Sequence, residues 1–370
     1  MLAVDAARVD AGSGPCVAGP LTEITDDPSD RWYVLSSTVS SADRVYVSSG
    51  DARHGNEARL DVVDWDARRI RTLATPQPPR RLWRLPPTLA LDTQLLLVGE
   101  SNPGTFDLLT TNTDGVWDGL ALPIATRSLN GYGASASRGQ WIVALNTSVQ
   151  TQVNRFPQPL GPGTSRQVQD AWCGNAGLMT PLAVNDDALV LVCNVPVPNW
   201  HVRARVVRLP DLAIGPVVDL APGAPSAVLA ATAAGHGGIA IVWGRSSGVA
   251  QTTLSRFDSA DLRALGSPTI VATSGTNGFV AGGALAPWRD RWLLARVRST
   301  GAGNVQLGLA ERGVDGDAAS DEMAIALPEI ASAFGPTLRM TGDRGMLLFT
   351  AQRIGRAPFH TFAMALRCMR

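Results

Sequence analysis

Residues Gly244 to Gly248 form the pattern that surrounds the nucleophilic serine of many acyl-transfer sites. Their order, Gly-Arg-Ser-Ser-Gly, matches G-x-S-x-G. That chemistry requires a strand, a strained turn and then a helix, which together expose the serine hydroxyl. Here the pattern leads into residues 249–257, which read as another strand. We therefore interpret Ser246 as part of a hairpin loop, and we assign no catalytic residue.

An acidic run is the best local candidate for a cation site. Asp315, Asp317 and Asp321 supply carboxylate oxygens, which calcium prefers as ligands. The run lacks the full twelve-residue pattern of a calcium loop, and an ordinary solvated loop is the simpler interpretation. No Cys-x-x-Cys or His-x-x-x-His spacing occurs, so a zinc site built from neighbouring residues is unsupported. We expect no cofactor, with calcium at these aspartates as the alternative.

These residues lie within a unit that recurs seven times. Each unit has a short apolar run, a turn, a second apolar run, a longer polar loop and a third, alternating run. Successive second runs begin 46 to 54 residues apart, at residues 45–47, 95–98, 141–144, 189–192, 239–242, 292–295 and 346–349. A strand-rich repeat near 50 residues is typical of β-propeller blades. The sequence predicts an all-β, seven-bladed propeller of four-stranded antiparallel blades.

Propeller topology assigns every loop to one of two faces. With strands A to D counted outward from the axis, the B–C loops and the crossings between blades share one face, here called the crossing face. Aromatic, Arg and His side chains collect there, and such groups bind sugars or small anions by stacking and bidentate hydrogen bonding. The predicted ligand-binding residues are Trp32, His54, Arg81, Trp83, Tyr132, Trp172, Trp200, His201, Phe279, Phe334 and His360. For any single tryptophan, a wedge packed between blades is the favoured alternative.

The two ends of the chain are expected to share the last blade. Residues 359–368 read as strand C of the seventh repeat, and no strand D follows. Residues 17–25 resemble the outer strands of other blades, so the N-terminal strand would complete the last blade and close the ring. Cys16 and Cys368 would then meet across an antiparallel ladder and form a disulfide.

The other two cysteines flank the inner hairpin of the fourth repeat. Cys173 and Cys193 are predicted to form a second disulfide, although four cysteines allow three pairings. The alternative is four buried thiols. Paired cysteines favour an oxidising compartment: extracellular, periplasmic or at the cell surface.

Composition restricts the classes of partner. The 370 residues carry a formal net charge of +0, so no overall field attracts nucleic acid. No apolar run approaches the roughly 20 residues of a membrane-spanning helix. We expect a monomer with one domain over residues 16–370, preceded by a flexible segment over residues 1–15 whose small and acidic residues cannot build a core.

Two short segments resemble known types of protein. Residues 5–14 resemble the Asp/Ala/Gly tethers that follow lipoprotein anchors in myxobacteria-like organisms, although no signal peptide is visible. Residues 111–117, Thr-Asn-Thr-Asp-Gly-Val-Trp, resemble a degenerate Asp-box, a fold element of sialidase-like propellers that is remote from their chemistry. That resemblance implies a propeller, and Tyr132 with Arg81 or Arg127 would be the plausible participants in sialidase-like catalysis.

The sequence therefore predicts a non-catalytic recognition or scaffold module outside the cytoplasm. Its partner would be a carbohydrate, a peptide or another protein, bound on the crossing face. The alternative is a carbohydrate-active enzyme, a sialidase-like hydrolase or lyase, with its site at the central mouth. A metal-dependent lactonase-like propeller would use Asn130, Asn175 and Asn277, but no matching acids accompany them.

Overall fold

A computed structural model shows an all-β chain, and no helix occurs among the residues it describes. These residues are 16–25, 33–51, 58–73, 88–91, 94–102, 105–112, 122–125, 131–146, 150–169, 172–173, 179–185, 187–195, 201–222, 224, 227–245, 251–273, 283–299, 305–314 and 322–369. In this part of the chain, nothing is helical, long and apolar enough to cross a membrane.

The described strands pair into seven antiparallel sheets. Six of them follow the chain from the innermost strand outward. The first two sheets contain β2 (Tyr33–Ser40), β3 (Arg44–Asp51), β4 (Ala58–Asp64) and β5 (Arg69–Leu73), and β6 (Thr88–Leu91), β7 (Gln94–Asn102), β8 (Thr105–Asn112) and β9 (Leu122–Ala125). The next two contain β10 (Gly131–Ser137), β11 (Gln140–Asn146), β12 (Thr151–Pro157) and β13 (Thr164–Val168), and β14 (Met179–Ala183), β15 (Ala188–Val195), β16 (His201–Arg208), β17 (Ala213–Ile214) and β18 (Val218–Asp219). The last two contain β19 (Ala227–Gly235), β20 (Gly238–Arg245), β21 (Gln251–Asp258) and β22 (Thr269–Thr273), and β23 (Gly283–Trp288), β24 (Arg291–Ser299), β25 (Val305–Gly313) and β26 (Met323–Ala326).

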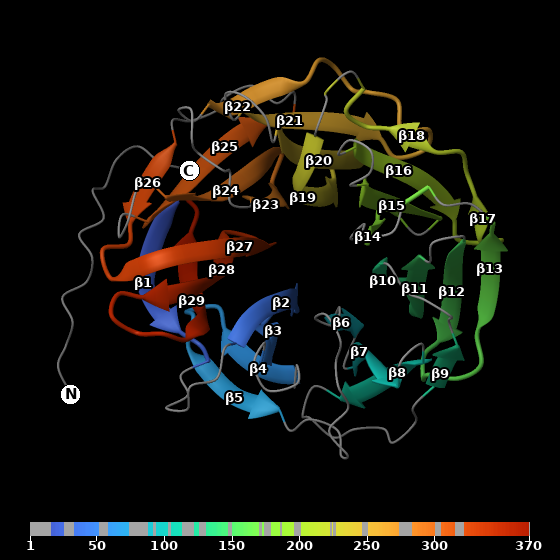
Figure 1. Ribbon diagram of the computed structural model, residues 1–370, viewed down its shortest axis with the longest axis horizontal. Helices are drawn as coiled ribbons and strands as arrows, with labels where there is room; N and C mark the ends of the chain where they lie inside the picture. Colours follow the sequence, from blue (N-terminus) through green and yellow to red (C-terminus); the bar gives the residue numbers. More distant parts are fainter. Residues whose placement is uncertain are drawn as a thin grey trace.

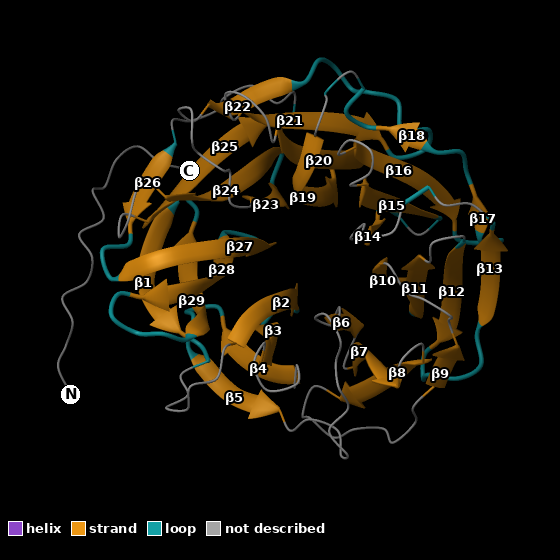
Figure 2. Cartoon of the chain, viewed as in Figure 1, coloured by secondary structure: helices purple, strands orange, loops and turns teal. Residues whose placement is uncertain are grey.

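The remaining sheet joins the two ends of the chain. Its order is β1 (Val17–Glu23), β29 (Phe359–Arg367), β28 (Arg344–Arg353) and β27 (Ile330–Thr341). Figures 1 and 2 show the sheets arranged radially around a common centre, with the innermost strands facing it. The predicted propeller of four-stranded antiparallel blades is confirmed. One sheet departs from it, because its outer strand is split into β17 and β18, which both pair with β16.

The second strand of each repeat is apolar because it lies between two neighbouring sheets. Along β15, residues Leu189 to Cys193 are all fully buried, so both faces of this strand pack against protein. Alternate residues enter different clusters: Leu191 packs with the preceding sheet and Val192 with the following one. A continuous apolar run is expected for a strand buried on both faces.

Tight turns join the first and second strands. Arg138 and Gly139 both have positive φ (49° and 66°), as do His236 and Gly237 (51° and 75°). Two consecutive residues with positive φ make the two-residue hairpin turn that matches the twist of its flanking strands. The His236 turn contacts the next sheet, where His236 Nε2 lies 2.8 Å from the carbonyl oxygen of Arg291. Because this turn joins the first and second strands of its sheet, His236 lies at the end of the sheets opposite to the crossing face.

Aspartates organise the turns between the third and fourth strands. Asp64 Oδ1 accepts hydrogen bonds from the amides of Asp66 and Arg68, and Asp258 Oδ1 accepts one from the amide of Ala260. Each turn then places a buried apolar residue in the left-handed region, Ala67 at φ 63° and Leu262 at φ 59°. The Asp-box-like segment at residues 111–117 lies mostly outside the described residues.

Both predicted disulfides are confirmed. Cys16 bonds to Cys368 next to the first pair of the β1–β29 ladder, in which Val17 faces Arg367. Cys173, which lies before β14, bonds to Cys193 in β15. All four cysteines are buried.

Candidate functional site

The best-defined candidate site lies where the two ends of the chain meet. Glu23 ends β1 and stands opposite Phe362 of β29 in the ladder. His360, two residues before Phe362, points to the same side of the sheet. Arg353 ends β28, and the turn that follows carries Arg356 and leads into β29. Strand pairing thus brings residue 23 against residues 353–362 at the crossing-face end of the sheet.

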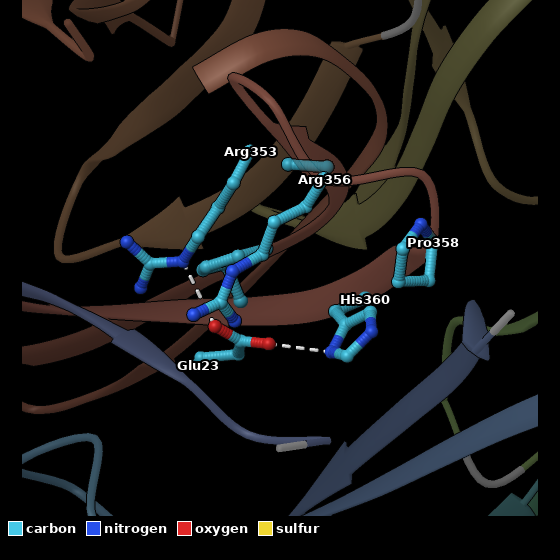
Figure 3. Close-up of a pocket in the computed structure, with 7 residues that line it drawn as sticks. Glu23, Arg353, Arg356, Pro358 and His360 are labelled. Carbon is cyan, nitrogen blue, oxygen red and sulfur yellow. Dashed lines mark hydrogen bonds and ion pairs between the residues drawn. The ribbon is translucent and has the colours of Figure 1, made fainter. Parts of the chain in front are cut away.

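Glu23 lies between a guanidinium group and an imidazole, as Figure 3 shows. Its Oε2 accepts a hydrogen bond of 2.9 Å from Nε of Arg353, and its Oε1 lies 2.5 Å from Nδ1 of His360. The latter oxygen is close but poorly aligned for a hydrogen bond, since Nδ1 has no partner of acceptable geometry among the described residues. We treat this contact as electrostatic: it is an ion pair when the imidazole is protonated.

Arg353 holds several groups together. It donates a second, short hydrogen bond to Oε2 of Glu329, and its guanidinium carbon lies 5.2 Å from the centroid of the Phe362 ring. A guanidinium group over an aromatic face adds a favourable cation–π contact. Its planar fork allows it to bridge two carboxylates, which a lysine ammonium would do with less defined geometry.

A small hollow adjoins these groups. Glu23, Ala351, Arg353, Arg356, Pro358, His360 and Phe362 line it. Its volume of about 10 Å³ is near the minimum needed for one water molecule. His360 is only 5% exposed, and its Nε2 has no hydrogen-bond partner among the described residues. Arg356 is exposed, and none of the described residues pairs with its guanidinium group.

The surroundings of Glu23 favour its charged form. Burial raises the pKa of this carboxyl group, but the contacts with His360 and Arg353 outweigh burial, and the net pKa is below the ordinary value of 4.5. A carboxylate with a lowered pKa in the folded state stabilises the fold above its unfolded pKa, and this contribution disappears as the pH falls through the folded pKa.

Replacing this carboxylate therefore has a pH-dependent effect. At neutral pH, Glu23→Gln lowers the free energy of unfolding by about 1–3 kcal/mol, because the charge-assisted hydrogen bond from Arg353 and the electrostatic contact with His360 are lost from a mostly buried position. The difference between wild type and variant shrinks as the pH falls below the ordinary glutamate value of 4.5. Urea unfolding at neutral and acidic pH measures both effects.

The matched control is Asp66→Asn, because the ion pair of Asp66 with Arg367 is half-exposed on both sides. Such pairs contribute at most about 1 kcal/mol. A Glu23→Gln deficit that stayed constant into acid would contradict the assigned role of the carboxylate.

The other predicted site residues lie apart. Phe334 is 37% exposed on β27, and its ring meets that of Phe359 edge-on at 5.4 Å. His201 is partly buried at the start of β16, with Nδ1 3.4 Å from Oδ2 of Asp219. Tyr132 lies in β10. Trp32, His54, Arg81, Trp83, Trp200, Phe279, Asp315, Asp317 and Asp321 lie outside the described residues, as do Ser246 and residues 1–15.

Trp172 occupies a packed position. It is 4% exposed and donates a hydrogen bond of 2.5 Å from Nε1 to Oγ1 of Thr151 in the preceding sheet. The guanidinium carbon of Arg205 lies 5.4 Å from the centroid of its ring. These contacts are those of a wedge between sheets, the alternative favoured for single tryptophans.

Sequence reasoning identified His360 but missed Glu23, Arg353 and Arg356. The signal for Glu23 in the sequence is weak, because Glu23 is a single acid at the end of a short strand. The signal for the two arginines is their position at the end of the second strand and in the B–C turn of the last repeat. Among the described residues, no group of three or more His, Cys, Asp or Glu side chains is placed to hold a metal ion.

No protein-family model and no curated protein matches the chain. Solved structures do match it. One is a prolyl endopeptidase, with a TM-score of 0.54 and 16% identity over 90% of this chain and 47% of that one. Another is the β-propeller domain of the Trilobed protease from Pyrococcus furiosus, described as having an open velcro topology. Its TM-score is 0.52, with 8% identity over 92% of this chain and 99% of that one.

A third is a quinohemoprotein alcohol dehydrogenase from Pseudomonas putida, with a TM-score of 0.51 and 9% identity over 96% of this chain and 76% of that one. This chain spans about half the length of the prolyl endopeptidase. At these identities the matches establish the propeller fold, and the differing activities of the three proteins show that the fold alone does not specify function.

Proposed function

We propose that this protein is a non-catalytic recognition or scaffold propeller that binds a carbohydrate, peptide or protein partner on its crossing face. The observation that carries the proposal is the exposed Phe334 ring against Phe359, on the same sheet as the hollow lined by Arg356 and His360. An accessible aromatic ring near hydrogen-bonding groups is the combination that sugar and peptide ligands use.

We further propose that the sheets form one closed ring of seven blades. Each innermost strand contacts the innermost strand of the next sheet, and β27 contacts β2. Across that last seam, Nε of Arg339 donates a hydrogen bond of 2.9 Å to Oγ1 of Thr38. The Cys16–Cys368 disulfide holds the outer side of the same sheet. A closed ring would present its loops rigidly, which lowers the entropic cost of binding.

We also infer that the protein is a monomer and that it lies outside the cytoplasm. The location is supported by two buried disulfides, which persist in oxidising compartments. Residues 1–15 would then connect the propeller to a surface anchor, as in the lipoprotein tethers that the sequence of residues 5–14 resembles.

The test is a binding screen of the full chain on glycan and peptide arrays, followed by a matched pair of variants. Phe334→Ala removes the exposed ring of the crossing face, whereas Ile270→Ala removes a 56% exposed side chain from an outer strand. We expect Phe334→Ala to weaken binding of a hit about tenfold or more, as loss of an interface aromatic does, and Ile270→Ala to leave it unchanged.

Equal affinities of the two variants would contradict the assignment of the crossing face. Hydrolysis or elimination of a bound glycan, followed by chromatography of its products, would replace the binding role with the carbohydrate-active alternative.

A further inference from the structure

We propose that the surface formed by Phe334, Phe359 and Gln352 binds a neutral sugar. The two rings contact the apolar face of a pyranose, and Gln352 accepts a hydrogen bond from one of its hydroxyl groups. This inference deepens the proposed function and rests on it for the use of the crossing face. It names the class of ligand and the residue that orients it.

The ladder of the last sheet places these side chains on one face. Two rows, two residues apart, carry the side chains of this face: Ser332, Gln352 and Phe359, then Phe334, Thr350 and Thr361. The Phe334 and Phe359 rings meet edge-on with their centroids 5.4 Å apart, and Phe334 is 37% exposed. An accessible aromatic surface of this kind packs against the C–H groups of a sugar ring.

The backbone of β27 is irregular on both sides of Phe334. Its register against β28 shifts just before Ser332 and again after Phe334. Gly335 has a positive φ of 60°, and a Cβ built there would meet no atom within 4 Å. Because β27 is the innermost strand of its sheet (Figure 1), these irregularities lie where the sheet borders the centre of the ring. Bulges re-aim side chains and are frequent beside functional sites.

Gln352 provides an oriented acceptor beside the rings. Its Nε2 donates hydrogen bonds to the carbonyl oxygens of Arg356 and Ala357, at 3.0 and 2.9 Å. These two bonds fix the orientation of the amide, because exchanging its oxygen and nitrogen would place three oxygens together. The side chain is partly exposed, and no described residue donates a hydrogen bond to Oε1. This oxygen is therefore available to a donor such as a sugar hydroxyl group.

The charges around this face favour a neutral ligand. None of the six residues in the two rows is charged. On the neighbouring sheet, Arg59 and Asp61 pair with each other at 2.8 Å. Glu23 and Arg353 occupy alternate positions, on the other side of the last sheet, and Figure 3 shows Arg356 over Glu23 there. A charged group would lose hydration here, and the described side chains of this face offer it no opposite charge.

The first experiment follows the aromatic NMR signals of the full chain during titration with methyl glycosides. The neutral probes are the glycosides of glucose, galactose, mannose, xylose, fucose and N-acetylglucosamine, and methyl glucuronide is the charged probe. Phe334→Ala and Phe359→Leu identify the ring signals. We expect a saturable shift of these signals with at least one neutral probe. The proposal is overturned if no neutral probe gives such a shift, or if the glucuronide binds more tightly than every neutral probe.

The decisive experiment combines a variant with a modified ligand. Each monodeoxy analogue of the best neutral probe lacks one hydroxyl group, and Gln352→Met removes the acceptor while keeping the length of the side chain. In the wild type, one analogue should bind about tenfold more weakly than the parent, as loss of one hydrogen bond predicts. In Gln352→Met the parent and that analogue should bind equally, because the partner of the hydroxyl group is gone.

The matched control is Gln167→Met, at an exposed position of the outer strand β13, and it should keep the tenfold difference. A general disturbance of the turn by Gln352→Met would weaken both ligands alike and leave their ratio unchanged, which would overturn the role of Gln352. The wild type supplies a second readout. The side-chain carbonyl 13C signal of Gln352 should shift with the parent sugar and not with that analogue, and equal shifts would also contradict this role.

The two proposals fail separately. Array hits that are peptides only, and that Phe334→Ala weakens, would retain the crossing face and refute the sugar. Hits that ignore Phe334→Ala would refute the proposed function itself.

Discussion

Removing the Cys16–Cys368 disulfide by the double substitution Cys16→Ala and Cys368→Ala lowers the free energy of unfolding by up to about 5 kcal/mol. The two cysteines are 352 residues apart in the sequence, so their bond restricts nearly the whole unfolded chain. In the chain-entropy account, the stabilisation grows with the length of the closed loop. Both side chains are buried, and alanine avoids placing a new polar group there.

The other disulfide provides the matched control. Cys173 and Cys193 are only 20 residues apart, and the same account gives about 3 kcal/mol for the double alanine variant. Urea unfolding of both variants measures the order, and hydrogen exchange in β1 locates the effect. A smaller loss for the Cys16 and Cys368 pair than for the Cys173 and Cys193 pair would contradict loop length as the dominant factor.

The second large effect is expected at Trp292, a wedge between sheets. Its side chain is 2% exposed at the start of β24 and packs with Ala233, Val242 and Val271 of the preceding sheet. The ring of His236 meets it edge-on at 4.8 Å. We expect Trp292→Ala to cost about 3–5 kcal/mol, because a large cavity opens between two rigid sheets.

Trp292→Phe separates packing from hydrogen bonding. The indole Nε1 is buried without a partner among the described residues, so phenylalanine loses no hydrogen bond and keeps much of the volume. Trp292→Phe should lower the free energy of unfolding by less than half as much as Trp292→Ala. Ile270→Ala, at an exposed position, should stay within about 0.5 kcal/mol of wild type. Comparable losses for Trp292→Phe and Trp292→Ala in urea unfolding would refute this account.

The sheets were predictable because burial on both faces leaves a strong pattern. Runs such as residues 189–193 are continuously apolar, and their spacing reveals the repeat without any knowledge of side-chain contacts. The partnership of Cys16 with Cys368 followed from the same pattern, since a missing outer strand had to come from the other end of the chain. The break between β17 and β18 was missed, although Gly215 and Pro216 lie between the two pieces and a Gly-Pro pair is a signal for a turn or loop.

The candidate site was only partly predictable because its contacts join distant residues. Arg353 and Glu23 are 330 positions apart, and neither belongs to a motif. Trp172 and Phe334 illustrate the remaining difficulty. Both are aromatic residues near the start of a repeat, but one is 4% exposed and the other 37% exposed, and this difference depends on neighbours that composition does not reveal.

The pairing of β1 with β29 has a consequence for biosynthesis. β1 is synthesised before every other described strand and pairs with β29, which is synthesised after all of them, so Val17 meets Arg367 only when the whole propeller has been made. Until then β1 has an open edge that other chains could join. A nascent chain of this protein therefore needs protection at β1, and truncation before β29 should release aggregation-prone polypeptide rather than a smaller folded product.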